Sequence, residues 1–263
     1  MKKFGFGTMR LPLIDSQDKS SIDMEELKKM VDEFMAAGFT YFDTAFTYHE
    51  QLSESVLKEA LVDRYDRDSY IFADKMPTVL VKSGDEYPMY FNKQLEKTGV
   101  GYFDYYLMHN MGRDRYFNTH KWGGFDFARR MKEEGKIKKF GFSFHDDAEM
   151  LDQILTEHPE VDFVQLQINY LDWENKIIQS RACYETARKY NKPIVVMEPV
   201  KGGTLANLPK EADSMLYEYA PGVLPVSYAL RFAASLPGVF MVLSGMSSLE
   251  QVKDNIHLSL IHI

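Results

Sequence analysis

Cysteine is almost absent from this chain of 263 residues, because Cys183 is the only one. A single thiol forms no internal disulfide and excludes a metal site built from cysteines. The sequence also lacks an apolar run of about 18 residues, the length that a membrane helix needs, and its N-terminus lacks the apolar segment of a secretory signal. We therefore expect a cytoplasmic protein that does not bind a membrane.

Positive charge is scarce as well. The chain has 31 Lys and Arg against 39 Asp and Glu, a formal net charge of -8, and no basic block longer than the stretch at residues 136–139. Such a chain offers no strong positive field to a phosphate backbone, so we expect no nucleic-acid partner. A hydrophobic content of 45% and a charged content of 27% are those of an ordinary globular protein, and one large domain fits the length.

Buried strands alternate with helices along the whole chain. Apolar residues at a spacing near 3.6 predict a helix over residues 24–37, with Gly38 as its C-terminal stop. Continuous apolar runs between the helices are typical of parallel strands. The predicted strands are residues 4–9, 39–42, 69–73, 103–108, 137–142, 163–168, 193–197 and 238–243. The other predicted helices are residues 54–62, 84–97, 125–134, 147–156, 177–190, 225–235 and 248–255.

Eight strand-helix pairs in this length predict an α/β fold, a closed (β/α)8 TIM barrel of parallel strands, rather than an open doubly wound sheet. A dinucleotide-binding fingerprint is missing, because residues 5–10 begin as Gly-x-Gly but place Arg10 where the third glycine belongs. We predict one domain over residues 1–257.

The last six residues, 258–263, correspond to the translation of a transposon end sequence used in preparing DNA libraries. We interpret them as a non-native tail and expect the natural protein to continue beyond Asn255. A short natural tail is the alternative.

Ionisable side chains end three consecutive predicted strands, at Asp43, Lys75 and His109. A barrel assembles its active site at the C-terminal ends of its strands, so we expect these groups to meet at one mouth, joined by Tyr48. Asp43 is a suitable counter-ion for a buried Lys75, and a lysine cation would lower the pKa of the Tyr48 phenol from about 10. Tyr48 would then protonate a carbonyl oxygen that His109 holds by a hydrogen bond. Because no side chain supplies a hydride, this chemistry implies a nicotinamide cofactor and a small-molecule carbonyl substrate.

Each of these residues has an ordinary structural interpretation when it is taken alone. A charged residue at a strand end is more often a cap or a surface charge, and one tyrosine among 16 more often packs than reacts. Four compatible groups near three successive strand ends favour the catalytic interpretation. A lysine at a strand end also serves Schiff-base lyases and aldolases, so that chemistry stays open for Lys75. His145, His158 and His257 lack the spacing of metal ligands, and we expect no metal site.

Six segments carry a shared pattern in order and spacing: residues 5–11, 38–48, 104–109, 135–137, 141–143 and 244–255. Together they resemble the aldo-keto reductase superfamily, whose fold is a (β/α)8 barrel that binds NADP(H) without a dinucleotide-binding fingerprint. The resemblance covers nearly the whole chain up to Asn255 and implies reduction of an aldehyde or ketone to an alcohol. It implies a catalytic tetrad in which Tyr48 is the general acid, Lys75 and Asp43 tune it, and His109 orients the substrate.

The resemblance also implies a set of cofactor-binding residues. Ser143 and Gln165 match residues that hold the nicotinamide amide, and Gln251 and Asn255 match the adenine end. In some branches, basic residues bind the 2'-phosphate of NADP(H), but the matching positions near Gly245 and Gln251 are not basic here. Other branches use Ser and Gln there, and Ser247 with Gln251 fits those branches. NADP(H) is therefore the expected cofactor and NAD(H) the alternative. The full expected set is Ser143, Gln165, Glu198, Pro199, Val200, Gly202, Ser244, Gly245, Ser247, Gln251 and Asn255.

The resemblance is strongest to a bacterial and archaeal branch that carries segments like residues 165–173 and 198–203. Members of that branch often continue into a ferredoxin-like segment that binds a 4Fe-4S cluster. Such a segment would follow Asn255 in the natural protein and would imply an electron-transfer partner or domain. Potassium-channel β subunits share the fold and keep the tetrad, so a nucleotide-binding, redox-sensing or regulatory subunit with little turnover is the alternative function.

Overall fold

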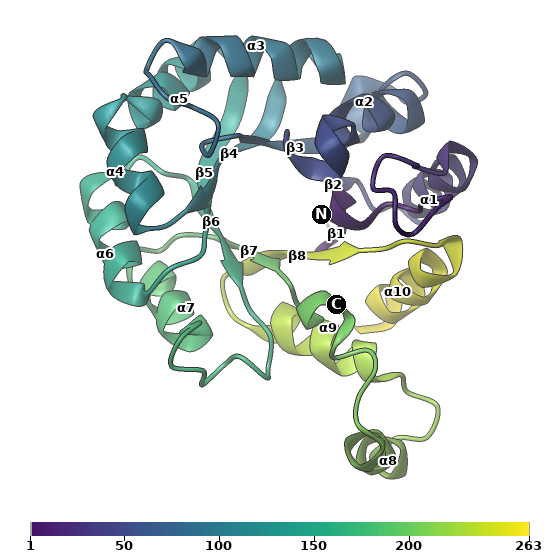
Figure 1. The fold of residues 1–263 in the computed structure, drawn as a ribbon. Helices are drawn as coiled ribbons and strands as arrows, with labels where there is room; N and C mark the ends of the chain where they lie inside the picture. Colours follow the sequence, from purple (N-terminus) through teal and green to yellow (C-terminus); the bar gives the residue numbers. More distant parts are fainter. Residues whose placement is uncertain (1, 263) are drawn as a thin grey trace.

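The chain folds into a closed barrel of eight parallel strands surrounded by helices, which confirms the predicted TIM barrel (Figure 1). The computed structural model describes the backbone of residues 2–262 and the side chains of residues 2–257. The strands pair in chain order, and the last closes the barrel against the first. They are β1 (Phe4–Gly7), β2 (Tyr41–Asp43), β3 (Ile71–Met76), β4 (Phe103–Met111), β5 (Ile137–Phe144), β6 (Phe163–Gln167), β7 (Ile194–Met197) and β8 (Val239–Gly245).

Helices cover the outer face of the barrel (Figure 1). The first begins where the Asp23 side chain accepts a hydrogen bond from the Glu26 backbone N–H, 3.0 Å away, and ends before Gly38, whose φ of 77° favours glycine. The α-helices are α1 (Met24–Ala36), α2 (Ser53–Leu57), α3 (Glu86–Thr98), α4 (Arg113–Lys121), α5 (Gly124–Glu133), α6 (Ala148–Glu157), α7 (Ser180–Lys189), α8 (Lys210–Tyr219), α9 (Pro225–Ser235) and α10 (Leu249–His262).

Apolar side chains fill the molecule on both sides of the sheet. A smaller cluster lies inside the barrel and includes Tyr41, Leu107 and Phe163, while a larger one packs the outer face of the strands against the helices. Phe34 of α1 illustrates the outer layer, because its ring lies 5.4 Å from the ring of Phe6 on β1. This alternation of inward and outward side chains fixes the register of each strand. It also determines which strand-end residues face the mouth.

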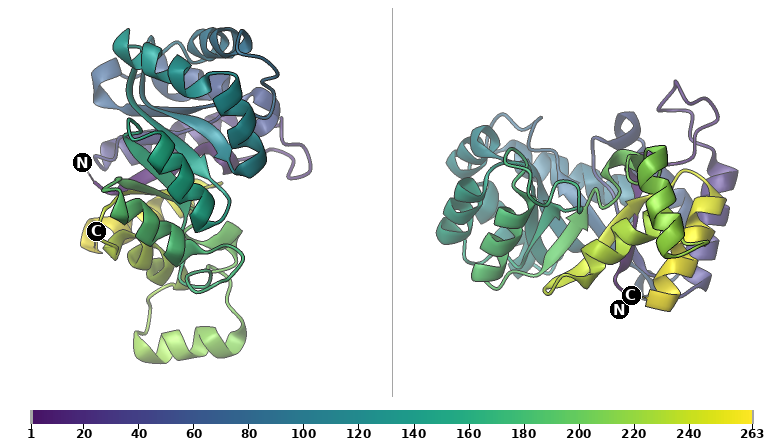
Figure 2. Two further views of the ribbon diagram at one scale, coloured as in Figure 1. Left: turned by 90° about the vertical axis from the view of Figure 1, so that its left-hand side faces the viewer. Right: turned by 90° about the horizontal axis from the view of Figure 1, so that it is seen from below.

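Several predicted boundaries were wrong, and two helices were not predicted at all. The strand expected over residues 4–9 ends at Gly7, because residues 8–10 form a turn of 3-10 helix. Strand β3 begins two residues later than expected and extends to Met76, so Lys75 lies within it. The expected helix over residues 54–62 is split into α2 and a π-helical turn, Lys58–Val62. The two unpredicted helices are α4 and α8; the latter has no buried residue and lies apart from the ring of helices (Figure 1, Figure 2).

Within the part of the chain that the structure describes, every helix is too short or too polar to cross a membrane. The backbone of α10 continues to His262. The side chains of residues 258–263, which we interpret as a non-native tail, lie outside the described residues.

Candidate active site

A cavity of about 760 Å³ opens at the C-terminal ends of the strands. Every strand contributes at least one lining residue, as expected for the functional face of this barrel. All fifteen residues predicted from the sequence line it: Asp43, Tyr48, Lys75, His109, Ser143, Gln165, Glu198, Pro199, Val200, Gly202, Ser244, Gly245, Ser247, Gln251 and Asn255. The cavity therefore brings together the expected tetrad and the residues expected to bind a cofactor.

The Lys75 ammonium lies buried between β2 and β3. Its Nζ donates hydrogen bonds to Oδ1 of Asp43, 2.5 Å away, and to the backbone carbonyl of Thr44, 2.7 Å away. Burial opposes the charge of Lys75, but Asp43 and Tyr48 outweigh burial and raise its pKa above the ordinary value. Lys75 is therefore a fixed positive charge at the floor of the cavity.

Tyr48 stands in the turn after β2, above that charge. The centroid of its ring lies 5.0 Å from Nζ of Lys75 and 5.8 Å from the centroid of the His109 ring, which is nearly perpendicular to it. Burial raises the pKa of Tyr48, and Lys75 opposes the rise without cancelling it. The expected lowering of the Tyr48 pKa was therefore wrong in direction. Removal from water destabilises the phenolate by more than the charge of Lys75 stabilises it. Tyr48 keeps its proton at neutral pH.

His109, at the end of β4, is neutral in the same range. Burial and the neighbouring charges of Lys75, His145 and Arg115 hold its pKa well below the ordinary value. A neutral imidazole can donate one N–H hydrogen bond to a ligand oxygen. Tyr48 and His109 thus place two proton-bearing groups side by side at the cavity.

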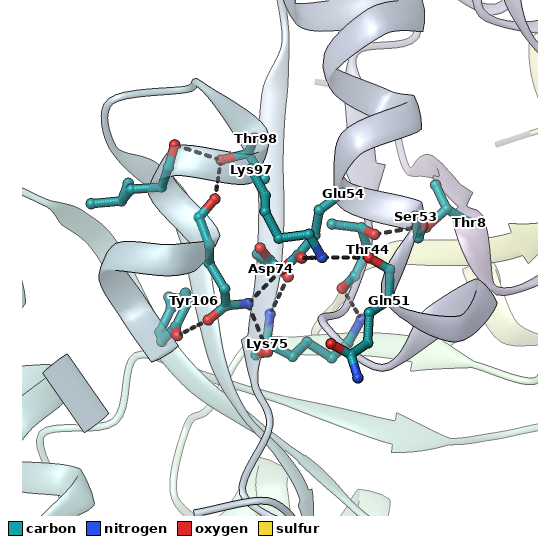
Figure 3. A network of polar contacts seen from close by, with 12 residues as sticks. Thr8, Thr44, Gln51, Ser53, Glu54, Asp74, Lys75, Lys97, Thr98 and Tyr106 are labelled. Atoms are coloured by element: carbon teal, nitrogen blue, oxygen red, sulfur yellow. Dashed lines mark hydrogen bonds and ion pairs between the residues drawn. The ribbon is translucent and has the colours of Figure 1, made fainter. Parts of the chain in front are cut away.

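A buried polar network supports Lys75 from behind (Figure 3). Nε2 of Gln94 donates to the backbone carbonyl of Lys75 and to Oε1 of Glu54, each 3.0 Å away, and Lys97 forms an ion pair with Glu54. Burial, with Glu54 close by, raises the pKa of Asp74 well above its ordinary value. The network fixes the backbone of β3 at Lys75.

Two residues at the centre of the cavity fit the carboxamide of a nicotinamide. Oγ of Ser143 accepts a hydrogen bond from the backbone N–H of Asn110, 2.7 Å away, which orients its hydroxyl. The Gln165 side chain is buried, and its Oε1 has no hydrogen-bond partner among residues 2–257. A buried amide oxygen without a partner is costly, and an incoming N–H donor would satisfy it.

The far end of the cavity is built from the segments after β7 and β8 and from the start of α10. Oε1 of Gln251 accepts a hydrogen bond from the backbone N–H of Ser247, 2.9 Å away, and Nδ2 of Asn255 donates to Oγ of Ser244, 3.2 Å away. Glu198 has a left-handed backbone with a φ of 53° and turns the chain into the segment that contains Pro199, Val200 and Gly202. These polar groups and backbone turns line the side on which the adenine end of a cofactor was expected.

Arg10 is a lining residue that the sequence analysis did not assign to the site. Gly245 and Gly202 have no Cβ, and this lets Arg10 approach them closely. A Cβ added to Gly245 would lie 3.2 Å from Cβ of Arg10, and one added to Gly202 would lie 3.2 Å from Nη2 of Arg10. The arginine stem therefore rests on Gly245, and its guanidinium reaches Gly202. His145 also lines the cavity.

Comparison with known proteins agrees with this architecture. An aldo-keto reductase from Bacillus halodurans in its holo form is 20% identical with a TM-score of 0.75, and the match covers 99% of this chain and 87% of that one. A thermostable aldo-keto reductase bound to the inhibitor epalrestat is 20% identical with a TM-score of 0.76, over 99% and 90% of the two chains. An aldo/keto reductase from Klebsiella pneumoniae, in complex with NADP and acetate, is 18% identical with a TM-score of 0.76, over 99% and 87%.

No curated protein matches the chain. At identities near 20%, the structural likeness shows a shared fold. The sequence profile of the aldo/keto reductase family, in contrast, matches residues 3–262 directly. The chain therefore belongs to the aldo/keto reductase family.

Proposed function

We propose that the protein is an NADPH-dependent oxidoreductase that reduces an aldehyde or ketone to an alcohol, with Tyr48 as the general acid. The observation that carries this proposal is the meeting of Tyr48, Lys75 and His109 in one cavity beside the unsatisfied amide oxygen of Gln165. Family membership and the NADP complex of the Klebsiella pneumoniae reductase support the choice of cofactor.

NADP(H), when bound, supplies or accepts a hydride. Ser143 and Gln165 would hold its nicotinamide carboxamide, and Ser247, Gln251 and Asn255 would hold its adenine end. His109 donates an N–H hydrogen bond to the carbonyl oxygen of the substrate and so orients it. As negative charge develops on that oxygen, Tyr48 transfers its hydroxyl proton to it.

Lys75 lowers the cost of that proton transfer. Its ammonium is buried beside Tyr48, so it stabilises the phenolate that is left when the proton moves. Asp43 holds the ammonium in place through the 2.5 Å hydrogen bond. Burial opposes the charge of Lys75, but Asp43 and Tyr48 outweigh burial and raise its pKa. The raised pKa disfavours the neutral amine that a Schiff-base lyase needs. Reduction therefore fits the site better than lyase or aldolase chemistry.

The proposal is tested by titrating the protein with NADPH and with NADH while nicotinamide fluorescence is followed. The complex is then mixed with a panel of aldehydes and ketones, and loss of the reduced cofactor is recorded. We expect saturable binding that is tighter for NADPH, and oxidation of the bound cofactor by at least one carbonyl compound. Tight binding without turnover would favour a regulatory subunit, and a folded protein that binds neither cofactor would contradict the proposal.

Arg10→Ala is expected to weaken NADPH binding by about 10- to 100-fold, since a charge-assisted hydrogen bond to phosphate contributes about 1.5–3 kcal/mol. The guanidinium at Gly202 is suited to a phosphate group at the far end of the cavity. If it contacts the 2'-phosphate, the Kd for NADH changes much less. Fluorescence titration of both cofactors measures the two effects. Arg129→Ala is the matched control, because Arg129 pairs with Asp126 and does not line the cavity.

A further inference from the structure

Two histidines and a glutamate meet on the outer helical layer, away from the cavity. His120 belongs to α4, Glu157 ends α6, and His158 follows it. One ligand atom from each of the three residues lies within 4.8 Å of the others. None of the three lines the candidate active site. We propose that His120, Glu157 and His158 bind a divalent transition-metal ion of the zinc class.

The separation of the two imidazole nitrogens is the first argument. Nδ1 of His120 and Nε2 of His158 are 3.3 Å apart. Zinc-nitrogen bonds are about 2.0–2.1 Å long, and two such bonds at a tetrahedral angle place their nitrogens about 3.3–3.4 Å apart. The pair is thus already spaced as two ligands of one tetrahedral ion.

The orientation of His158 is the second argument. Its ring stacks on Phe125 with a centroid distance of 3.7 Å and an interplanar angle of 9°. Its Nδ1 lies 3.2 Å from Oε1 of Glu160, so a proton on Nδ1 is held by that carboxylate and the lone pair is left on Nε2. Metal-binding histidines commonly have such a carboxylate on the nitrogen that does not bind the ion. His158 is therefore fixed with its ligating atom toward His120.

Glu157 completes a set of two nitrogens and one oxygen. Its Oε2 accepts a hydrogen bond from the Tyr116 hydroxyl, and its Oε1 accepts one from Nε2 of Gln153, 2.8 Å away. A carboxylate oxygen has more than one lone pair, so these contacts orient the group and leave it able to bind an ion. Two histidines and a glutamate form a known zinc ligand set, with water in the fourth position. His120 and Glu157 are exposed, which gives an ion direct access from solvent.

A bound ion would join α4 to the end of α6. The competing interpretation is a simple hydrogen bond, in which Nδ1–H of His120 donates to Nε2 of His158. The two interpretations predict different responses to added metal, because the hydrogen bond alone gives neither saturable binding nor stabilisation by Zn²⁺. The site is independent of the proposed reduction, so its test does not depend on a substrate.

The experiment is a calorimetric titration of ZnCl₂ into the 263-residue chain, which carries no histidine tag and has been treated with a chelator. We expect one Zn²⁺ per chain and a higher Tm in the presence of Zn²⁺. His120→Ala, an exposed change that leaves the fold intact, is expected to weaken binding by more than about tenfold and to abolish the Tm shift. Glu160→Gln is expected to weaken binding by about tenfold through the orientation of His158.

His257→Ala is the matched control, because His257 is exposed and lies on α10. It should bind Zn²⁺ as the unmodified chain does. Loss of binding in the His120 variant but not in the His257 variant supports the site. Equal affinity in the unmodified chain and in His120→Ala, or absence of saturable binding by the unmodified chain, would overturn the proposal and leave a hydrogen-bonded histidine pair.

Discussion

Tyr48→Phe is expected to lower kcat for carbonyl reduction by about a thousandfold, within the range that a positioned general acid contributes. The substitution removes one hydroxyl and keeps the ring that packs 5.0 Å from Nζ of Lys75 and 5.8 Å from the His109 ring. The loss corresponds to about 4 kcal/mol of transition-state stabilisation. The Kd for NADPH should stay unchanged, because Ser143, Gln165 and the far end of the cavity are untouched. Steady-state kinetics and fluorescence titration of the same sample separate the two quantities.

Tyr219→Phe provides the control for this variant, since Tyr219 is exposed on α8 and lies outside the cavity. It should retain the activity of the unmodified chain. A Tyr48→Phe protein that reduces the aldehyde within a few-fold of the unmodified rate would refute the assignment of Tyr48 as the acid. The proton would then have to come from another titratable group that lines the cavity, such as His109 or His145.

The barrel and the position of Asp43, Lys75 and His109 at its mouth were predictable from local sequence because each signal depends on a single element. An apolar run identifies a strand, and the C-terminal ends of parallel barrel strands meet at one mouth. Lys75 shows the limit of this argument: its strand extends to Met76, beyond the predicted end, and the lysine is still directed to the mouth by the alternation of side chains. The error in the boundary therefore did not move the residue out of the site.

Helices α4 and α8 were missed because little of either is buried. Helix α4 buries only Tyr116 and Thr119, and α8 buries none of its residues. Prediction from periodicity requires an apolar face packed on a core, which neither helix has.

Properties that depend on contacts between distant parts of the chain could also not be predicted from the sequence. The raised pKa of Tyr48 follows from how deeply the folded chain buries its hydroxyl, which its neighbours in sequence do not determine. The position of Arg10 depends on Gly202 and Gly245, which lie far from it in the sequence. His120 and His158 are 38 residues apart, and only the packing of their two helices brings the imidazoles together.

Lys75→Met is expected to lower kcat by about 10²–10³-fold, because it removes the charge that stabilises the developing phenolate. It also leaves Asp43 buried without its ionic partner, which costs about 3–5 kcal/mol of stability. Because Lys75 opposes the rise in the pKa of Tyr48, its removal should raise that pKa further. Any fall of kcat that accompanies Tyr48 ionisation at alkaline pH should then move to higher pH. Urea unfolding and a pH profile of kcat measure the two effects.

The double variant Asp43→Asn/Lys75→Met separates stability from catalysis. Folding stabilises the protonated form of Lys75, since its pKa is raised in the folded chain by Asp43 and Tyr48 against the effect of burial. That contribution is present below the ordinary value of 10.5 and is lost as the pH rises through the folded value. With both charges removed, we expect most of the lost stability to return while kcat stays low. Recovery of activity together with stability would instead mean that Lys75 serves the fold alone, and Tyr48 would then transfer its proton without help from a neighbouring cation.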